Sequence, residues 1–73
     1  MMADEEWTRF ASTLLKGELA RAGIGYVQLI ARLDEIGVKE NYKGLAAKIN
    51  RGTFSFIFFA QCMKALGKET IRF

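Results

Sequence analysis

Residues 26–52 read YVQLIARLDEIGVKENYKGLAAKINRG, and most of the fold can be inferred from this stretch. Its first part repeats apolar side chains at the three- and four-residue spacing of an amphipathic helix, and these side chains are Tyr26, Leu29, Ile30, Leu33 and Ile36. Asn41 then precedes a second helical run, where its short amide can accept the free backbone N–H groups of the first turn. The pattern predicts two helices, over about residues 26–36 and 42–50, joined by a short connector.

Two further helical runs flank these helices. The first covers about residues 4–22, starts with acidic side chains that suit a helix N-terminus, and ends at a glycine. The second covers about residues 55–66, from the serine at its first position, a good N-cap, to the residue before Gly67. We therefore predict an all-α fold in which residues 1–73 form a single four-helix domain. Residues 69–73 alternate in polarity, which suits a short C-terminal strand or a frayed end equally.

The helical spacing also assigns inner and outer faces. In the first helix the expected inner face carries Trp7, Phe10, Ala11, Leu14, Leu15 and Ala22. In the helix over 42–50 the expected inner face carries Tyr42, Leu45, Ala46 and Ile49. Its outer face then carries Lys43, Gly44, Ala47, Lys48, Asn50 and Arg51. This outer face combines small residues with a basic border.

The helix over 55–66 is apolar on most of its circumference and must be covered on more than one side. One flank can face the other helices, whereas the opposite flank would expose aromatic surface unless something docks there. A second copy of the chain, related by a two-fold axis, is the cover that we expect. The predicted dimer interface consists of Phe54, Phe56, Phe58 and Phe59.

The charge of the chain favours an anionic partner. Lys and Arg total 11 against 8 Asp and Glu, which gives a formal net charge of +3. Three of the acidic residues lie at positions 4–6, so the rest of the chain is more strongly basic. A basic surface of this kind attracts nucleic acid, and it also suits a small domain that needs net charge only for solubility.

The side chains that most enzymes use are absent. The sequence has no histidine, which removes the commonest general base and metal ligand together, and its single cysteine excludes an internal disulfide. Cys62 lies in an apolar helix and is expected to be an inert hydrophobic residue. Glu18 falls on the apolar side of the first helix, where we expect an ion pair with Arg51 or Lys48 in preference to a catalytic role. We therefore predict a binding protein that is not an enzyme and uses no metal, cofactor or small-molecule ligand.

Nothing in the sequence predicts export or membrane insertion. The N-terminus is acidic and amphipathic, unlike a secretory signal, and no apolar run approaches the ~18 residues that a membrane span needs. A free thiol without export signals is typical of the cytoplasm. We expect a cytoplasmic protein without a membrane partner.

The order of several motifs resembles the phage-repressor-like helix-turn-helix domains of the xenobiotic-response-element type. The motifs that carry the resemblance are RAGI at 21–24, YVQLIARL at 26–33, KINRG at 48–52 and MKALG at 63–67. Residues 15–67 are also similar to a small bacterial family described only as a domain of unknown function, through LAAKINRGTF at 45–54 and FFAQC at 58–62.

The resemblance implies a compact helical DNA-binding fold in which the helix over 42–50 is the recognition helix. It would direct the side chains of Lys43, Ala47 and Lys48 toward a major groove. It would also place Lys39, Asn41 and Arg51 near phosphates. Two features depart from the usual pattern. The helix over 26–36 is longer by about a turn, and the connector over 38–42 is longer than the tight turn that normally fixes the two helices.

Two hypotheses about function follow. The first is a homodimeric helix-turn-helix protein that binds double-stranded DNA as a small transcriptional regulator and presents two recognition helices to a palindromic site. The second is a protein-interaction module of the same fold, in which the phenylalanine cluster binds a second copy or another protein and DNA is not bound. A small enzyme is a third and weaker hypothesis, because an acid, a base and metal ligands are missing.

Overall fold

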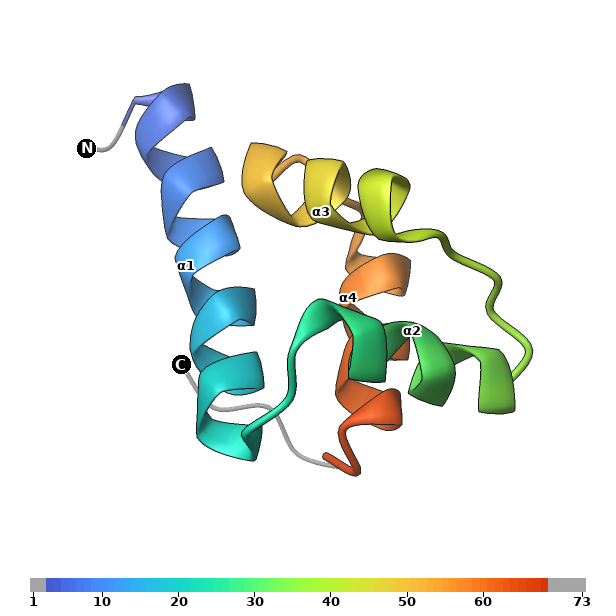
Figure 1. The fold of residues 1–73 in the computed structure, drawn as a ribbon. Coiled ribbons are helices and arrows are strands. Elements are labelled where there is room, and N and C mark those ends of the chain that lie inside the picture. The colour runs from blue at the N-terminus through green and yellow to red at the C-terminus, as the bar shows by residue number, and fades with distance from the viewer. Residues whose placement is uncertain (1–2, 69–73) are drawn as a thin grey trace.

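The computed structural model describes residues 3–68, which form four α-helices and no strand (Figure 1). They are α1 (Asp4–Ala22), α2 (Tyr26–Glu35), α3 (Tyr42–Arg51) and α4 (Phe56–Ala65). The predicted all-α class is confirmed, and each predicted helix boundary agrees with the structure to within one residue. The predicted C-terminal strand over 69–73 lies outside the described residues.

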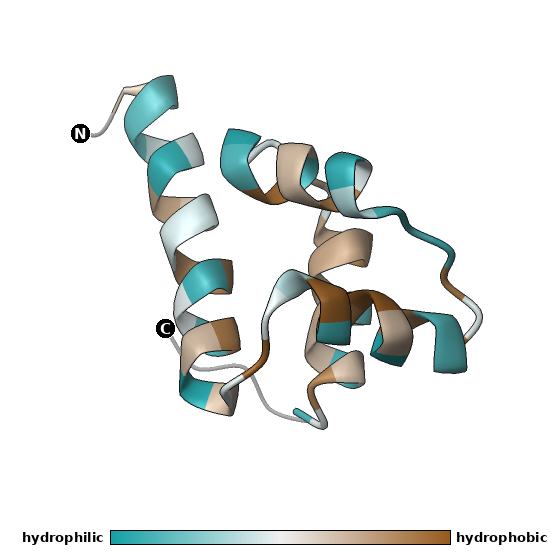
Figure 2. Cartoon of the chain, in the orientation of Figure 1, coloured by the Kyte–Doolittle hydropathy of each residue, from teal (hydrophilic) through white to brown (hydrophobic). Residues whose placement is uncertain are grey.

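The helices pack around one core. α1 runs along one side of the molecule and packs against α3, while α2 packs against both α3 and α4 (Figure 1). The centre of this core is made of fully buried side chains, which are Leu15, Leu29, Leu33, Leu45, Ile49 and Cys62. Figure 2 shows that the hydrophobic residues of α1, α2 and α3 lie mainly on the sides turned toward the other helices. The inward row predicted for α2 is therefore confirmed at its two buried leucines.

Polar caps and glycines define the helix ends. The side-chain oxygen of Asn41 accepts the backbone N–H of Gly44 at 2.7 Å, and the hydroxyl of Ser55 accepts that of Phe58 at 3.0 Å. Both are the N-cap residues that the sequence predicts. Gly67 follows α4 with a φ of 78°, in the left-handed region that glycine adopts without strain.

Gly52 brings α1 and α3 close together. Its φ is 70°, and an added Cβ atom would lie 1.8 Å from the backbone carbonyl oxygen of Thr8. No side chain larger than a hydrogen atom fits there, so the end of α3 lies directly on the backbone of α1. Ser12, one turn after Thr8, is buried as well.

The contact at Gly52 also explains why the predicted inner face of α1 is partly wrong. The buried face of α1 carries Ser12, Leu15 and Leu19, and at 3.6 residues per turn it points away from the two aromatic residues near the start of the helix. Trp7 and Phe10 are 51% and 44% exposed, and their rings pack edge to face with centroids 6.0 Å apart. A close backbone approach, which needs small side chains, determines which face of α1 is buried.

Candidate nucleic-acid interface

The exposed side of α3 carries four side chains that we call the α3 ridge: Lys43, Ala47, Asn50 and Arg51. Lys43, Ala47 and Asn50 follow one another at intervals of four and three residues, so they form one line along the helix, and Arg51 borders it. All four are exposed, while the opposite side of α3 is buried in the core. α3 contains no acidic residue. The ridge is therefore a solvent-facing surface with positive charge and small or uncharged side chains.

Two cations of the α3 ridge form no ion pair with the part of the chain that the structure describes. Within residues 3–68, neither Lys43 nor Arg51 forms an ion pair. The two residues lie in the first and last turns of α3, ~12 Å apart along the helix axis. The ridge thus has a free positive charge at each end and uncharged side chains between them.

The other polar residues predicted to face DNA are engaged within the protein. Lys39 pairs with Asp34 near the end of α2, and Nζ of Lys48 lies 2.6 Å from Oε2 of Glu40. The Glu40 side chain is only 10% exposed, so this ion pair holds the connector between α2 and α3. The carboxamide oxygen of Asn41 caps α3. These side chains hold the connector and helix start in place, and neither lysine adds free charge to the ridge.

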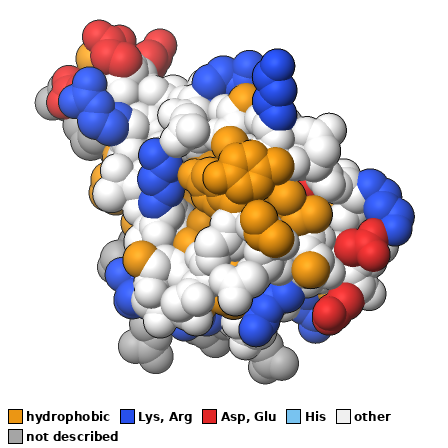
Figure 3. All heavy atoms as spheres, viewed as in Figure 1, with side chains coloured by type: hydrophobic (Ala, Val, Ile, Leu, Met, Phe, Trp, Pro, Cys, Tyr) orange, Lys and Arg blue, Asp and Glu red, His pale blue; other side chains and the backbone are white. Residues whose placement is uncertain are grey.

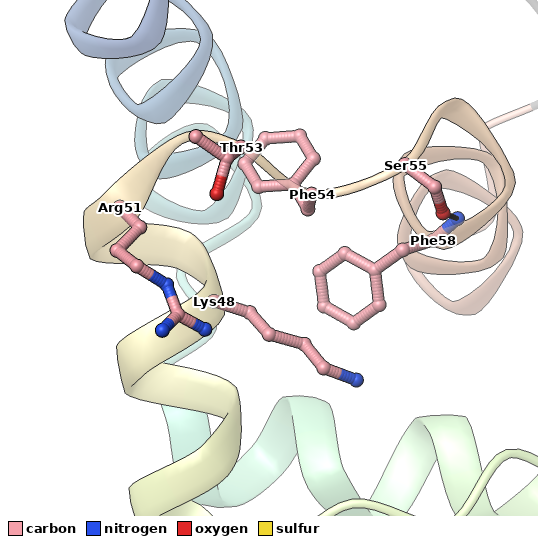
Figure 4. Close-up of a pocket in the computed structure, with 6 residues that line it drawn as sticks. All are labelled: Lys48, Arg51, Thr53, Phe54, Ser55 and Phe58. Atoms are coloured by element: carbon pink, nitrogen blue, oxygen red, sulfur yellow. Dashed lines mark hydrogen bonds between the residues drawn. The ribbon is translucent and has the colours of Figure 1, made fainter.

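Lys48 also contacts α4. Its Nζ lies 4.9 Å from the ring centroid of Phe58, which is a cation–π contact. Figure 4 shows the Lys48 side chain extending past the Phe58 ring and away from Arg51. The sequence places Lys48 on the outer face of α3, whereas its side chain turns toward the connector and α4. Lys48 thereby joins three segments and stabilises a connector that is longer than a tight turn.

An open pocket of about 240 Å³ lies between the end of α3 and the start of α4 (Figure 4). It is lined by Lys48, Arg51, Thr53, Phe54, Ser55 and Phe58. The Ser55 hydroxyl is occupied by the cap of α4. In the described part of the chain, the hydroxyl of Thr53 and the guanidinium of Arg51 form no hydrogen bond. These two groups extend the free polar surface of the α3 ridge into the loop that follows it.

Glu18 has different partners from those that the sequence predicts. It pairs with Arg21 in α1, and its second oxygen lies 3.9 Å from Nζ of Lys68. The predicted pair with Arg51 or Lys48 is wrong, because α3 ends against the N-terminal half of α1 whereas Glu18 lies in its C-terminal half. Arg51 consequently does not pair with Glu18, and its guanidinium stays available to a partner.

The predicted phenylalanine cluster divides between the core and the surface. Phe58 and Phe59 are 6% and 7% exposed, so they belong to the core of a single chain and are not available to a second copy. Phe54 is partly buried and packs against both rings. Phe56 is 71% exposed, and Ile57, which sequence reasoning does not single out, is 70% exposed beside it. The exposed apolar pair of α4 is therefore Phe56 and Ile57.

An exposed aromatic side chain also lies where α2 meets α3. Tyr42, predicted to point inward, is 56% exposed, and its ring packs edge to face on Tyr26 with centroids 5.7 Å apart. Burial, together with the neighbouring Tyr42, raises the pKa of Tyr26. Figure 3 shows the side of the molecule that is seen in Figure 1. An apolar area lies in the middle of this face, with Lys and Arg side chains above it. Cationic and apolar groups thus lie on the same face of the molecule.

Cys62 is the buried thiol of the core. Burial raises its pKa to about 12, with a smaller contribution from the Glu40 carboxylate that the Lys48 ammonium partly offsets. The thiol therefore stays protonated at neutral pH and packs as a small hydrophobic group. Residues 3–68 hold no group of three or more His, Cys, Asp or Glu side chains that could bind a metal ion. None of the helices in the described range is long and apolar enough to cross a membrane.

Comparison with known proteins assigns the chain to a family. The profile of a domain of unknown function, DUF6471, matches residues 7–71, a range that contains all of α2, α3 and α4. Neither the curated proteins nor the solved structures give a match. The predicted similarity to a family described as a domain of unknown function is thereby confirmed, and the chain belongs to the DUF6471 family.

Proposed function

We propose that the chain binds double-stranded DNA as a helix-turn-helix protein, with α3 as the helix that enters the major groove. The observation that carries this proposal is the α3 ridge, which is exposed and free of acidic residues. It ends in Lys43 and Arg51, two cations that form no ion pair among residues 3–68. A helix in a DNA groove needs cations for the phosphates and small side chains where its backbone approaches the base edges. The ridge combines both.

The packing of α2 on α3 supports the same proposal. The connector between these helices is held by the Lys48–Glu40 ion pair and by the Asn41 cap. α3 is thereby fixed on α2 without the tight turn of the common helix-turn-helix domains. A recognition helix that is already rigid loses little conformational freedom when it binds.

Phosphate contacts follow from the same geometry. Lys43 and Arg51 are ~12 Å apart along α3, close to the ~12 Å width of the major groove. Thr53 lines the same pocket as Arg51 (Figure 4). We propose that this guanidinium and hydroxyl share one phosphate, while Lys43 contacts another at the opposite end of α3.

Two double variants with the same change in net charge test the proposal. Lys43→Gln/Arg51→Gln removes the free cations of the α3 ridge, whereas Lys16→Gln/Lys64→Gln removes two exposed cations on α1 and α4. In anisotropy titrations against a mixed-sequence duplex at ~50 mM salt, we expect the ridge variant to lose about tenfold or more in affinity. The control variant should stay within about twofold of the wild type. Absence of wild-type binding, or equal losses in the two variants, would refute the proposal.

A cytoplasmic homodimer that regulates transcription is part of the proposal. Phe56 and Ile57 are adjacent and exposed at the start of α4, and a two-fold contact through them would present two copies of α3 to a palindromic site. Sedimentation equilibrium should show a dimer for the wild type and a monomer for Phe56→Asp. Val27→Asp is the matched control, because Val27 is 69% exposed on α2 and should leave the dimer intact.

The same exposed pair favours a second candidate function, a protein-interaction module that does not bind DNA. In that case Phe56→Asp abolishes association with the partner, and Lys43→Gln/Arg51→Gln leaves every interaction unchanged. The charge variant and the apolar variant therefore separate the two candidate functions.

A further inference from the structure

Ala47 and Asn50 lie between the free cations of the α3 ridge. Both are exposed, and the Asn50 carboxamide forms no hydrogen bond within residues 3–68. Asn41 differs, because its carboxamide oxygen is occupied by the cap of α3. Asn50 therefore presents both a free N–H donor and a free carbonyl acceptor on the solvent side of α3.

We infer that Asn50 recognises an adenine in the major groove and that Ala47 contacts the methyl group of a neighbouring thymine; this inference rests on the proposed DNA binding. A carboxamide presents a donor and an acceptor side by side. The major-groove edge of adenine matches this pair, with N7 as acceptor and the N6 amino group as donor. Guanine presents two acceptors at the same positions, so its O6 would face the carbonyl oxygen of Asn50. The match therefore selects adenine over guanine.

Ala47 determines which base pair is preferred next to that adenine. The two residues are three positions apart, which is ~4.5 Å along the helix axis, against a rise of ~3.4 Å per base pair. They therefore address neighbouring base pairs. The Ala47 methyl group lets the helix backbone approach the bases and suits contact with the C5-methyl group of thymine. A longer side chain would hold Asn50 away from the base edge, so the inference predicts two adjacent A·T pairs in each half-site.

The charged and uncharged residues of the α3 ridge then have separable roles. Lys43 and Arg51 contact phosphates, which supply affinity and its salt dependence but carry no sequence information. Asn50 and Ala47 contact base edges, which supply sequence preference. A change at Asn50 should consequently alter the preferred sequence while the salt dependence is retained.

In vitro selection from duplexes with a randomised central segment tests the inference on the full chain. The wild type should enrich sites with two adjacent A·T pairs. Asn50→Ala should reduce discrimination at one of these pairs by about 5- to 150-fold and keep the wild-type salt dependence. Asn50→Asp, whose carboxylate can accept from the N4 amino group of cytosine, should shift the preference at that position to cytosine.

Modified bases identify the atoms involved. Replacing the selected adenine by 7-deazaadenine should weaken wild-type binding and leave Asn50→Ala unaffected; circular dichroism verifies that the variant is folded. A selection without A·T enrichment, or an unchanged preference in Asn50→Ala, would overturn the inference while DNA binding stands. Failure of the wild type to retain any duplex at ~50 mM salt would overturn the proposed function and the inference together.

Discussion

Replacement of Gly52 by alanine should destabilise the protein far more than the same replacement at another glycine with the same backbone conformation. Gly52 has a φ of 70°, and its added Cβ would lie 1.8 Å from the carbonyl oxygen of Thr8. Gly23 has a φ of 69° and no atom within 4 Å of the added Cβ. Gly23→Ala therefore measures backbone strain alone, and Gly52→Ala measures the strain plus the collision between α3 and α1.

The two contributions can be estimated separately. The left-handed conformation costs an L-residue roughly 1–2 kcal/mol, which is the whole effect expected for Gly23→Ala. Moving α1 and α3 apart to admit a methyl group costs roughly 1–3 kcal/mol more. Gly52→Ala should thus lose roughly 2–5 kcal/mol in total. A domain of this length has a free energy of unfolding of about 4–11 kcal/mol, so the variant should lose a large part of the stability of the protein.

Urea titrations followed by circular dichroism provide the measurement, with the free energy of unfolding of each variant compared with that of the wild type. We expect Gly52→Ala to lose clearly more stability than Gly23→Ala. Equal losses in the two variants would refute the close packing of α3 on the backbone of α1.

Four further predictions concern the connector, the N-terminus and the thiol. In urea titrations Lys48→Met should lower the free energy of unfolding by roughly 2 kcal/mol, and Glu40→Gln should lower it by only about 1 kcal/mol. The first variant costs more because it leaves the Glu40 carboxylate, which is 10% exposed, without its cation. The reverse order of the two losses would contradict this pairing. Asp4→Asn/Glu5→Gln should raise duplex affinity about twofold at ~50 mM salt. These acids lie at the end of α1 that adjoins the end of α3 (Figure 1), so their negative charge repels phosphates bound there. A gain in affinity that persists at high salt would contradict this electrostatic origin. Cys62 should resist iodoacetamide in the native state and react in urea, since burial raises its pKa to about 12. Stability should fall as pH rises above 9.0, the ordinary pKa of the thiol, because the unfolded chain then releases a proton that the folded chain keeps. In Cys62→Ala the fall should be smaller and start nearer pH 10.0, because only Tyr26, whose pKa is also raised in the folded chain, then contributes to it.

The helices and their ends could be predicted from local signals in the sequence. Asn41 and Ser55 act on backbone groups three residues away, and Gly67 relieves strain at its own position. Such effects do not depend on distant parts of the chain, which explains why the helix boundaries agree with the structure. The apolar spacing of α2 likewise identifies its buried leucines.

The buried face of α1 could not be predicted in this way. The helical spacing of apolar side chains places Trp7 and Phe10 on the inner face, yet α1 meets α3 through the carbonyl of Thr8 and a glycine without a side chain. A contact between two backbones leaves no apolar pattern in the sequence. The same reasoning applies to α4, where a continuous apolar run does not show that Phe58 is buried and Phe56 is exposed.

The candidate interface was predictable in its helical part and not in its ion pairs. Lys43, Ala47 and Arg51 are exposed, as the periodicity of α3 indicates. The pairing of Lys48 with Glu40 depends on the path of an irregular connector, and no periodic spacing encodes that path. Free and neutralised cations therefore cannot be separated without the structure.

The slope of the logarithm of the duplex association constant against the logarithm of salt concentration bears most closely on the role of the α3 ridge. Each phosphate contact contributes about −0.9 to this slope. We predict a steep negative slope for the wild type, one shallower by about 1.8 for Lys43→Gln/Arg51→Gln, and an unchanged slope for Lys16→Gln/Lys64→Gln. A flat wild-type slope, or the same slope in both double variants, would contradict phosphate binding by the ridge.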